Sequence, residues 1–163
     1  MRRKILVPFD GSEPAEIALK WALLDAHDHG FPVKVLYVVD KRSVDLVSGF
    51  AARREKVVEE LKREGEKTLE EVDRIAEDLG VDVEIEKKIL VGVPWKEIVR
   101  EAEEDEDVNL IVMGSHGRTG LEHAVIGSVA ENVIRHSPVN VLIVRSGDRT
   151  IESVESARPS SDR

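Results

Sequence analysis

The sequence predicts an α/β fold: a doubly wound, five-stranded parallel sheet with strand order 3-2-1-4-5 and helices on both faces. Five short apolar runs rich in β-branched residues alternate with stretches that suit helices, the pattern of parallel βαβ units. At 163 residues and 41% hydrophobic content, the chain is long enough for one domain with a core and too short for two. The runs are Ile5 to Phe9, Val33 to Val39, Val81 to Leu90, Val108 to Met113 and Val139 to Val144.

The character of the runs places the strands within the sheet. Residues 35–39, 110–113 and 141–144 are continuously apolar, as in strands covered on both faces. The third run alternates strictly between apolar and acidic residues from Val81 to Glu86, so we expect it at an edge with one face in water. The last run, at the other edge, has no internal proline or lysine, and such edges favour pairing. It predicts a homodimer through antiparallel pairing of residues 139–145.

The first two helices have recognisable ends. Ser12 can cap the first helix, which should run toward Gly30 and which tolerates a proline in its first turn. The second carries apolar residues at helical spacing from position 57 and ends at Gly80. Gly65 falls on its apolar face, where close packing against the sheet is favoured over a hinge.

The remaining segments have weaker signals. Pro94 can begin a third helix, and the acidic run 103–107 that follows is expected to be a solvated helix end rather than a cation site. Residues 41–52 mix charged and apolar side chains without a period and are expected to be mobile. Residues 147–163 are polar and are expected to be a disordered tail, which leaves a domain of residues 1–146.

Charge and composition exclude several classes of protein. A net charge of -9, from 33 acidic and 24 basic residues, gives no basic field for nucleic acid or an anionic membrane. The chain has no cysteine, which excludes disulfides, thiolate metal sites and cysteine nucleophiles. The N-terminal apolar run is too short for a signal peptide, and no segment is long and apolar enough to span a bilayer, so a cytoplasmic location is expected.

A glycine cluster near the C-terminus indicates a cradle for phosphate. After the fourth run come Gly114-Ser115-His116-Gly117, nine further residues, and Gly127-Ser128. Gly114 and Gly117 can take positive φ and let the backbone approach a ligand, while Gly127-Ser128 opens a fourth helix whose N–H groups favour an anion. In the expected strand order the sheet reverses between its first and fourth strands, where ligands bind in such folds. This loop and Asp10, which follows the first strand, should therefore face one crevice.

Two common nucleotide motifs are absent from these positions. No Gly-Lys-Ser/Thr follows the loop, and no G-x-G-x-x-G follows the first strand. The remaining spacing, G-x-x-G-x9-G-S, resembles the ATP-binding signature of the universal stress protein (UspA-like) family. The segments Ile5 to Ser12, Tyr37 to Asp40, Gly92-Val93-Pro94 and Ser137 to Val144 are also similar to that family, so the resemblance covers roughly residues 2–145. It implies a Rossmann-like, adenine nucleotide alpha hydrolase-like fold and agrees with a homodimer.

The resemblance further implies ATP as the ligand, with magnesium or manganese carried by the nucleotide. The implied binding residues are Pro8 and Asp10 beside the adenosine, the backbone of Val38 at the adenine edge, Met113 and Gly114 at the ribose, and Gly117, Gly127, Ser128 and Val129 at the phosphates, with His116 and Arg118 in the same loop. Asp10 is the nearest carboxylate candidate for a nucleotide-bound ion. No dedicated metal site and no catalytic set is expected.

Four of these residues have simpler alternatives. Asp10 could serve only to cap the turn into the first helix, and Ser128 could be a plain helix cap. His116 could act as an acid or base in phosphoryl transfer, or could hydrogen-bond its own backbone. Arg118 could add charge at the γ-phosphate or be solvated.

Three hypotheses for function remain open. The first is a homodimeric, ATP-binding stress protein whose nucleotide state changes its contacts with an unknown protein partner. The second is a slow ATPase or phosphotransferase that uses Asp10 and His116, although the lysine that usually clamps a transferring phosphoryl group is missing. The third is a dimeric interaction module that binds no nucleotide.

Overall fold

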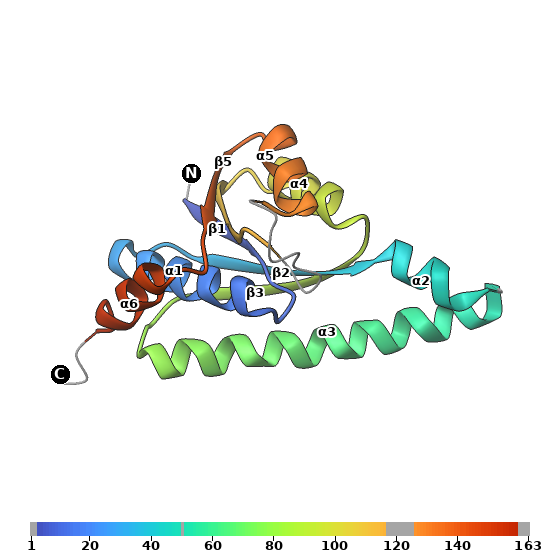
Figure 1. The fold of residues 1–163 in the computed structure, drawn as a ribbon, viewed down its shortest axis with the longest axis horizontal. Helices are drawn as coiled ribbons and strands as arrows, with labels where there is room; N and C mark the ends of the chain where they lie inside the picture. Colours follow the sequence, from blue (N-terminus) through green and yellow to red (C-terminus); the bar gives the residue numbers. More distant parts are fainter. Residues whose placement is uncertain (1–2, 50, 117–125, 160–163) are drawn as a thin grey trace.

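A five-stranded parallel sheet organises the chain, which we describe from a computed structural model (Figure 1). The description covers residues 3–49, 51–116 and 126–159. Parallel pairing in the order β3-β2-β1-β4-β5 confirms the predicted topology, including the edge positions of the third and fifth strands. The strands are β1 (Lys4–Pro8), β2 (Val33–Asp40), β3 (Ile85–Gly92), β4 (Val108–Gly114) and β5 (Asn140–Val144).

Helices cover both faces of this sheet, as predicted (Figure 1). One face carries α1 (Glu13–His29), α3 (Ala51–Leu79) and α6 (Asp148–Ser156), and the other carries α4 (Pro94–Glu104) and α5 (Ser128–His136).

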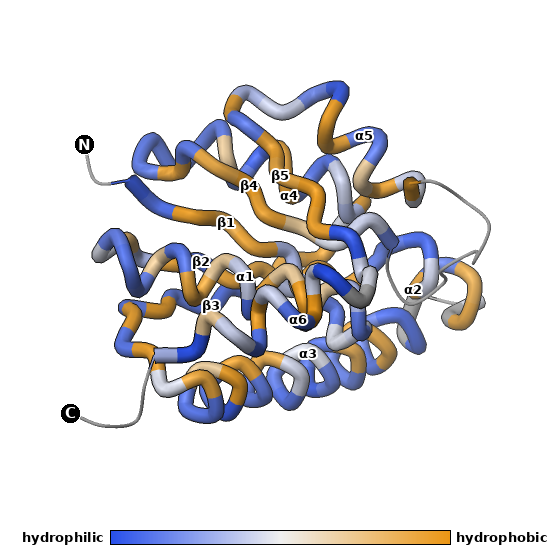
Figure 2. Tube along the Cα trace, turned by 60° about the vertical axis from the view of Figure 1, so that its left-hand side comes forward, coloured by the Kyte–Doolittle hydropathy of each residue, from blue (hydrophilic) through white to orange (hydrophobic). Residues whose placement is uncertain are grey.

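Each face of the sheet has its own buried cluster. Val7 and Val35 belong to one cluster and Leu6 and Leu36 to the other, because neighbouring residues of a strand point to opposite faces. Figure 2 shows apolar residues along the strands and hydrophilic residues on the outer side of α3. Within the described residues, no helix combines the length and the apolar character needed to cross a membrane.

The predicted helix ends are confirmed. Ser12 Oγ accepts a hydrogen bond from the Ala15 N–H (3.3 Å) and caps α1, which ends at Gly30 in the left-handed region (φ 69°). Gly80 follows α3 with the same φ. A Cβ on Gly65 would lie 2.6 Å from the ring of Tyr37, so this glycine lets α3 pack closely on β2.

Two elements differ from the prediction in the middle of the chain. β3 begins at Ile85 rather than Val81, because β2, its neighbour in the sheet, begins at Val33 opposite Ile85. Residues 41–52, expected to be mobile, contain the helix α2 (Lys41–Ser48). Val44 of α2 is buried, and one buried contact is too little to produce a periodic pattern in the sequence.

The C-terminal segment also differs from the prediction. Asp148–Ser156, expected to lie in a disordered tail, form α6. Val154 is buried, and Ile151, one helical turn earlier, packs against the same core cluster as α1. Two apolar residues at helical spacing are thus enough to attach this helix to the domain. The domain limit at residue 146 stays a prediction.

Charged side chains form a cluster at the amino-terminal end of the strands. Lys34 of β2 is buried, and its Nζ donates to Glu101 Oε1 (2.9 Å) and to Asp105. Lys4 also donates to Asp105 (2.8 Å), and Lys88 donates to Glu101 (2.7 Å). The acidic run 103–107 is therefore not only a solvated helix end, because Asp105 ties the end of α4 to β1 and β2.

This cluster shifts the pKa values of its carboxyl groups. Burial raises the pKa of Asp105, but the hydrogen bonds from Lys34 and Lys4 outweigh it and lower the pKa from 3.8 to about 2. Burial also raises the pKa of Glu101, but the hydrogen bonds from Lys88 and Lys34 outweigh it and lower the pKa below its usual value. A carboxylate with a depressed pKa in the folded state stabilises the fold above its unfolded pKa, and loses this effect as pH falls through the folded value.

We expect Asp105→Asn to lower the free energy of unfolding at pH 7 by about 2 kcal/mol. The difference from wild type should shrink between about pH 5 and pH 2, where wild type itself loses this contribution. Urea unfolding at several pH values measures both effects. Asp73→Asn is the control, because Asp73 pairs with Lys87 at an exposed site and should change stability by less than about 1 kcal/mol. An Asp105→Asn difference that is the same at every pH would contradict the argument.

Candidate functional site

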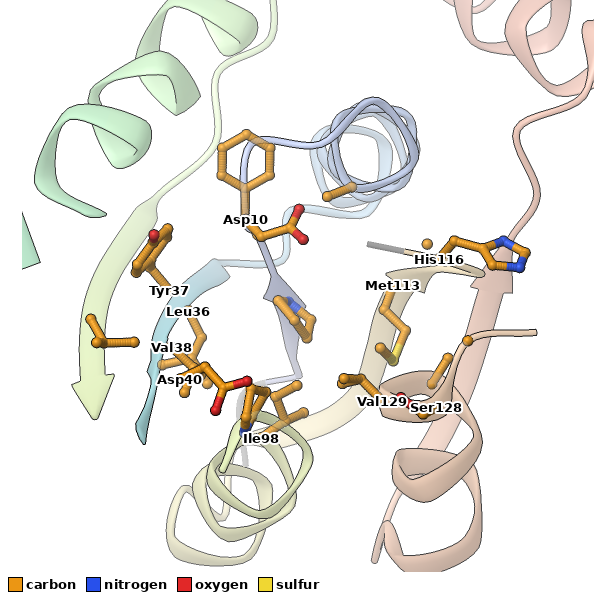
Figure 3. A pocket seen from close by; sticks show the side chains of 18 of the residues that line it. Asp10, Leu36, Tyr37, Val38, Asp40, Ile98, Met113, His116, Ser128 and Val129 are labelled. Atoms are coloured by element: carbon orange, nitrogen blue, oxygen red, sulfur yellow. The ribbon is translucent and has the colours of Figure 1, made fainter. Parts of the chain in front are cut away.

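A cavity of about 470 Å³ opens at the carboxyl ends of the strands, where the strand order reverses (Figure 3). Its lining comes from the ends of β1, β2 and β4 and from the first turn of α5, with contributions from α2, α3 and α4. In a doubly wound sheet this is the place where helices on opposite faces diverge and leave a crevice. The location agrees with the one expected from the sequence.

Asp10 stands on the β1 side of the cavity. Its Oδ1 accepts a hydrogen bond from the Ser12 N–H (2.9 Å), which fixes the turn into α1. Its carboxylate faces the cavity (Figure 3). Asp10 thus holds the turn and also presents a carboxylate to the cavity, so the two roles weighed from the sequence are compatible.

The segment after β4 forms the adjoining wall. Met113 is almost fully buried and points into the cavity (Figure 3). Gly114 does not have positive φ, contrary to our expectation. A Cβ there would lie 2.8 Å from the backbone of Pro14, so the glycine is required by the approach of α1 to β4.

His116 follows in the same wall. Its Nδ1 lies 3.0 Å from Ser115 Oγ, a side-chain contact with its neighbour. Its ring points away from Asp10 (Figure 3).

The first turn of α5 faces the cavity without a side-chain cap. Gly127, not Ser128, is the N-cap residue, so the prediction of Ser128 as a plain cap is wrong. The Gly127 N–H donates to the carbonyl of Ser115 (2.7 Å), and a Cβ on Gly127 would lie 3.1 Å from that oxygen. The first N–H groups of a helix have no intrahelical acceptor, and here they lie beside the cavity. This turn can therefore hold an anion.

The backbone of Val38 is directed toward the cavity from the β2 side. The Phe9 N–H donates to the carbonyl of Leu36 (2.9 Å), so the polar groups of Leu36 point toward β1. Backbone groups alternate in direction along a strand, and those of Val38 point the same way, beyond Pro8, the last residue of β1. Val38 therefore offers a donor and an acceptor side by side at the cavity wall.

Asp40 and Arg42 complete the β2 side. Asp40 Oδ1 accepts from Arg42 Nε (3.0 Å) and Oδ2 from Arg42 Nη2 (2.8 Å), and the hydrogen bond from Arg42 holds the pKa of Asp40 below its usual value. Both residues line the cavity, and the carboxylate of Asp40 faces it (Figure 3). Our sequence analysis did not place them in the site. The rule that identified Asp10, a carboxylate at the end of a strand beside the reversal, could have identified Asp40 as well.

Comparison with known proteins identifies the family. Residues 1–145 match the model of the universal stress protein family. The chain belongs to the universal stress protein family. Its Rossmann-like α/β fold is that of solved universal stress proteins.

Two relatives come from Methanocaldococcus jannaschii. The universal stress protein MJ0577 is 39% identical over 158 residues, which is 89% of this chain and 96% of the relative. The universal stress protein MJ0531 is 41% identical over 145 residues, 88% of this chain and 82% of the relative. The structure of MJ0577 superimposes with a TM-score of 0.78 at 38% identity and covers 91% of this chain and 99% of its own.

A third relative was solved with a ligand. The structure of the universal stress protein from Archaeoglobus fulgidus in complex with dAMP has a TM-score of 0.60 at 26% identity. The match covers 88% of this chain and 97% of that protein.

In this universal stress protein the cavity gathers most of the residues expected at a nucleotide site. The residues that line it as expected are Pro8, Asp10, Val38, Met113, Gly114, His116, Gly127, Ser128 and Val129. Gly117 and Arg118 lie outside the described residues. The roles of all eleven residues toward a ligand stay predictions. In the part of the chain that the structure describes, no three His, Asp or Glu side chains form a group suited to a metal ion.

We expect Gly114→Ala to destabilise the protein by about 2 kcal/mol, because the added methyl group overlaps the backbone of Pro14 and α1 must shift. Gly147→Ala is the matched control, since a Cβ at Gly147 meets no atom within 4 Å. Chemical unfolding of both variants measures the difference. Equal stability of the two variants would show that α1 adjusts without cost.

Proposed function

We propose that this protein binds an adenine nucleotide, ATP, in the cavity between β1 and β4 and acts as a nucleotide-dependent sensor or switch in a stress response. The observation that carries the proposal is the first turn of α5, which has no side-chain cap and lies beside the cavity at Gly127. Its N–H groups and the positive end of the helix dipole suit phosphate oxygens.

The residues around this turn fit a polyphosphate. Backbone N–H groups of Ser128 and Val129 supply donors, and the Ser128 hydroxyl supplies another. The absence of a side chain on Gly127 lets the segment after β4 approach this turn, since a Cβ would lie 3.1 Å from the Ser115 carbonyl. A magnesium or manganese ion carried by the nucleotide would neutralise phosphate charge, and Asp10 is the carboxylate that we assign to it.

The opposite side of the cavity favours adenine as the base. Adenine presents an acceptor nitrogen beside an amino donor, which the paired N–H and C=O of Val38 can complement. Leu36 and Ile98 supply apolar surface for the ring. The dAMP complex of the Archaeoglobus fulgidus relative supports the choice of an adenine nucleotide.

A binding role is favoured over rapid phosphoryl transfer. The lining residues that the structure describes include no lysine, whereas enzymes that transfer phosphoryl groups usually clamp them with one. His116, the candidate base, contacts Ser115 and its ring points away from Asp10 (Figure 3). We therefore assign the cavity to nucleotide sensing, and slow hydrolysis stays an alternative.

We also propose that the protein works as a homodimer through residues 139–145. Among the described residues, β5 pairs only with β4, so its other edge can accept a strand from a second copy. Val141, Leu142 and Ile143 are only partly buried in the single chain. Antiparallel pairing of two β5 strands would satisfy the backbone groups of that edge and cover these side chains.

We expect Gly127→Val to weaken ATP binding at least about tenfold, because the valine side chain would press on the Ser115 carbonyl and displace the first turn of α5 from the phosphates. The backbone of Gly127 (φ -77°, ψ 159°) is accessible to valine, so the strain of the substitution is confined to the contact with the Ser115 carbonyl. Calorimetric titration with ATP and magnesium measures the affinity, and hydrolysis is checked in the same samples.

Gly147→Val is the matched control for this titration. Gly147 is also an N-cap glycine with extended backbone (φ -112°, ψ 157°), but it precedes α6, and a Cβ there meets no atom within 4 Å. It should bind ATP as wild type does. If folded, nucleotide-free wild type binds no adenine nucleotide, the proposal is wrong. The dimer surface would then be the candidate functional surface.

The dimer is tested by sedimentation at micromolar concentration. We expect wild type to be a dimer and Ile143→Lys to shift it toward monomer, because a charge on β5 opposes burial of the strand edge. Leu46→Lys is the control, since Leu46 is 87% exposed on α2 and away from β5. A wild-type monomer at these concentrations would contradict the proposed interface.

A further inference from the structure

The helix α2 connects the cavity to an exposed apolar surface. It begins directly after Asp40, and Arg42 and Ser43 in its first turn line the cavity. Farther along it, Leu46 and Val47 have exposed fractions of 87% and 60% and are two of the three exposed large hydrophobic residues in the described part of the chain. Figure 1 shows α2 extending beyond the carboxyl ends of the strands.

Asp40 holds the first turn of this helix. Its Oδ1 accepts the Arg42 N–H (2.9 Å) and so caps α2, and both carboxylate oxygens bond the Arg42 guanidinium. Beyond these bonds, the described residues of α2 are anchored by the buried side chain of Val44 and by contacts with α3 and β3. The order of the helix therefore depends strongly on Asp40.

A ligand in the cavity would change the surroundings of this ion pair. The Asp40 and Arg42 side chains are 28% and 62% exposed, so water now competes for their charges. A ligand that fills the cavity removes part of that water, and a charged pair whose hydrogen bonds are already formed becomes stronger when water is excluded. The first turn of α2 is then held more firmly.

We propose that Asp40 is a positioning residue that couples occupancy of the cavity to the order of α2 through its paired hydrogen bonds to Arg42. The inference rests on the proposed function, because it needs a ligand in this cavity. Leu46 and Val47 lie on the same short helix, so occupancy would set how firmly this apolar pair is held. Because coupling is reciprocal, anything that orders α2 also favours the ligand.

Hydrogen exchange of the peptide 41–48, measured with and without saturating ATP and magnesium, tests the coupling. We expect ATP to slow exchange in wild type about fivefold. Asp40→Asn should abolish the slowing, because asparagine caps a helix as well as aspartate does but lacks the charge. Arg42→Met should abolish it too, since the cap at Asp40 remains and the guanidinium is gone.

Asp45→Asn is the matched control on the same helix. Asp45 pairs with Arg54 (3.3 Å) and does not line the cavity, so this variant should keep the slowing. Titration calorimetry on each sample sets the saturating ATP concentration. It also distinguishes a failure of ATP binding from a failure of the coupling. Absence of binding in folded wild type overturns the proposed function and the coupling with it. Binding with unchanged exchange at 41–48, or equal slowing in Asp40→Asn and Asp45→Asn, overturns the coupling alone.

Discussion

The reversal of strand order at β1 is the constraint on which the rest of this structure depends. β1 has β2 on one side and β4 on the other, and the helices that follow β1 and β4 pack on opposite faces. The chain therefore leaves a space above the strand ends that none of the described helices fills. Asp10, Val38 and Met113 come from three different strand ends, yet this topology alone brings them to one cavity.

The glycines of the chain show how closely this space is built. Gly114 lets α1 approach β4, Gly65 lets α3 approach Tyr37, and a Cβ on Gly92 would lie 2.3 Å from the carboxylate of Glu97. These glycines are explained by packing, with no ligand needed. Gly127 is also closely packed, on the Ser115 carbonyl, but it differs in preceding the first turn of α5, which lies beside the cavity. In the glycine motif, Gly114 thus serves the packing of the fold, and Gly127 lies at the candidate binding turn.

The fold could be predicted because its signals are local. Apolar runs, the cap at Ser12 and the stop at Gly80 each lie within a few residues of the element that they define. The charge cluster could not be predicted, since Lys34 meets Asp105 only after β2 and α4 are packed together. In the site, the strand-end rule placed Asp10 correctly but was not applied to Asp40. α2 was missed because it depends on one cap and on the burial of Val44.

The two sides of the cavity differ in what fixes them. The β1, β4 and α5 walls are fixed by the sheet, by the contact of Gly114 with Pro14 and by the bond from Gly127 to Ser115. The wall formed by Asp40 and Arg42 lies where β2 ends and a short helix with little buried surface begins, so it has the lower local stability. A ligand that spans the cavity touches both. The phosphates of the proposed nucleotide would meet a preorganised turn, while its base would adjoin the wall with the lower local stability, as the proposed sensor role requires.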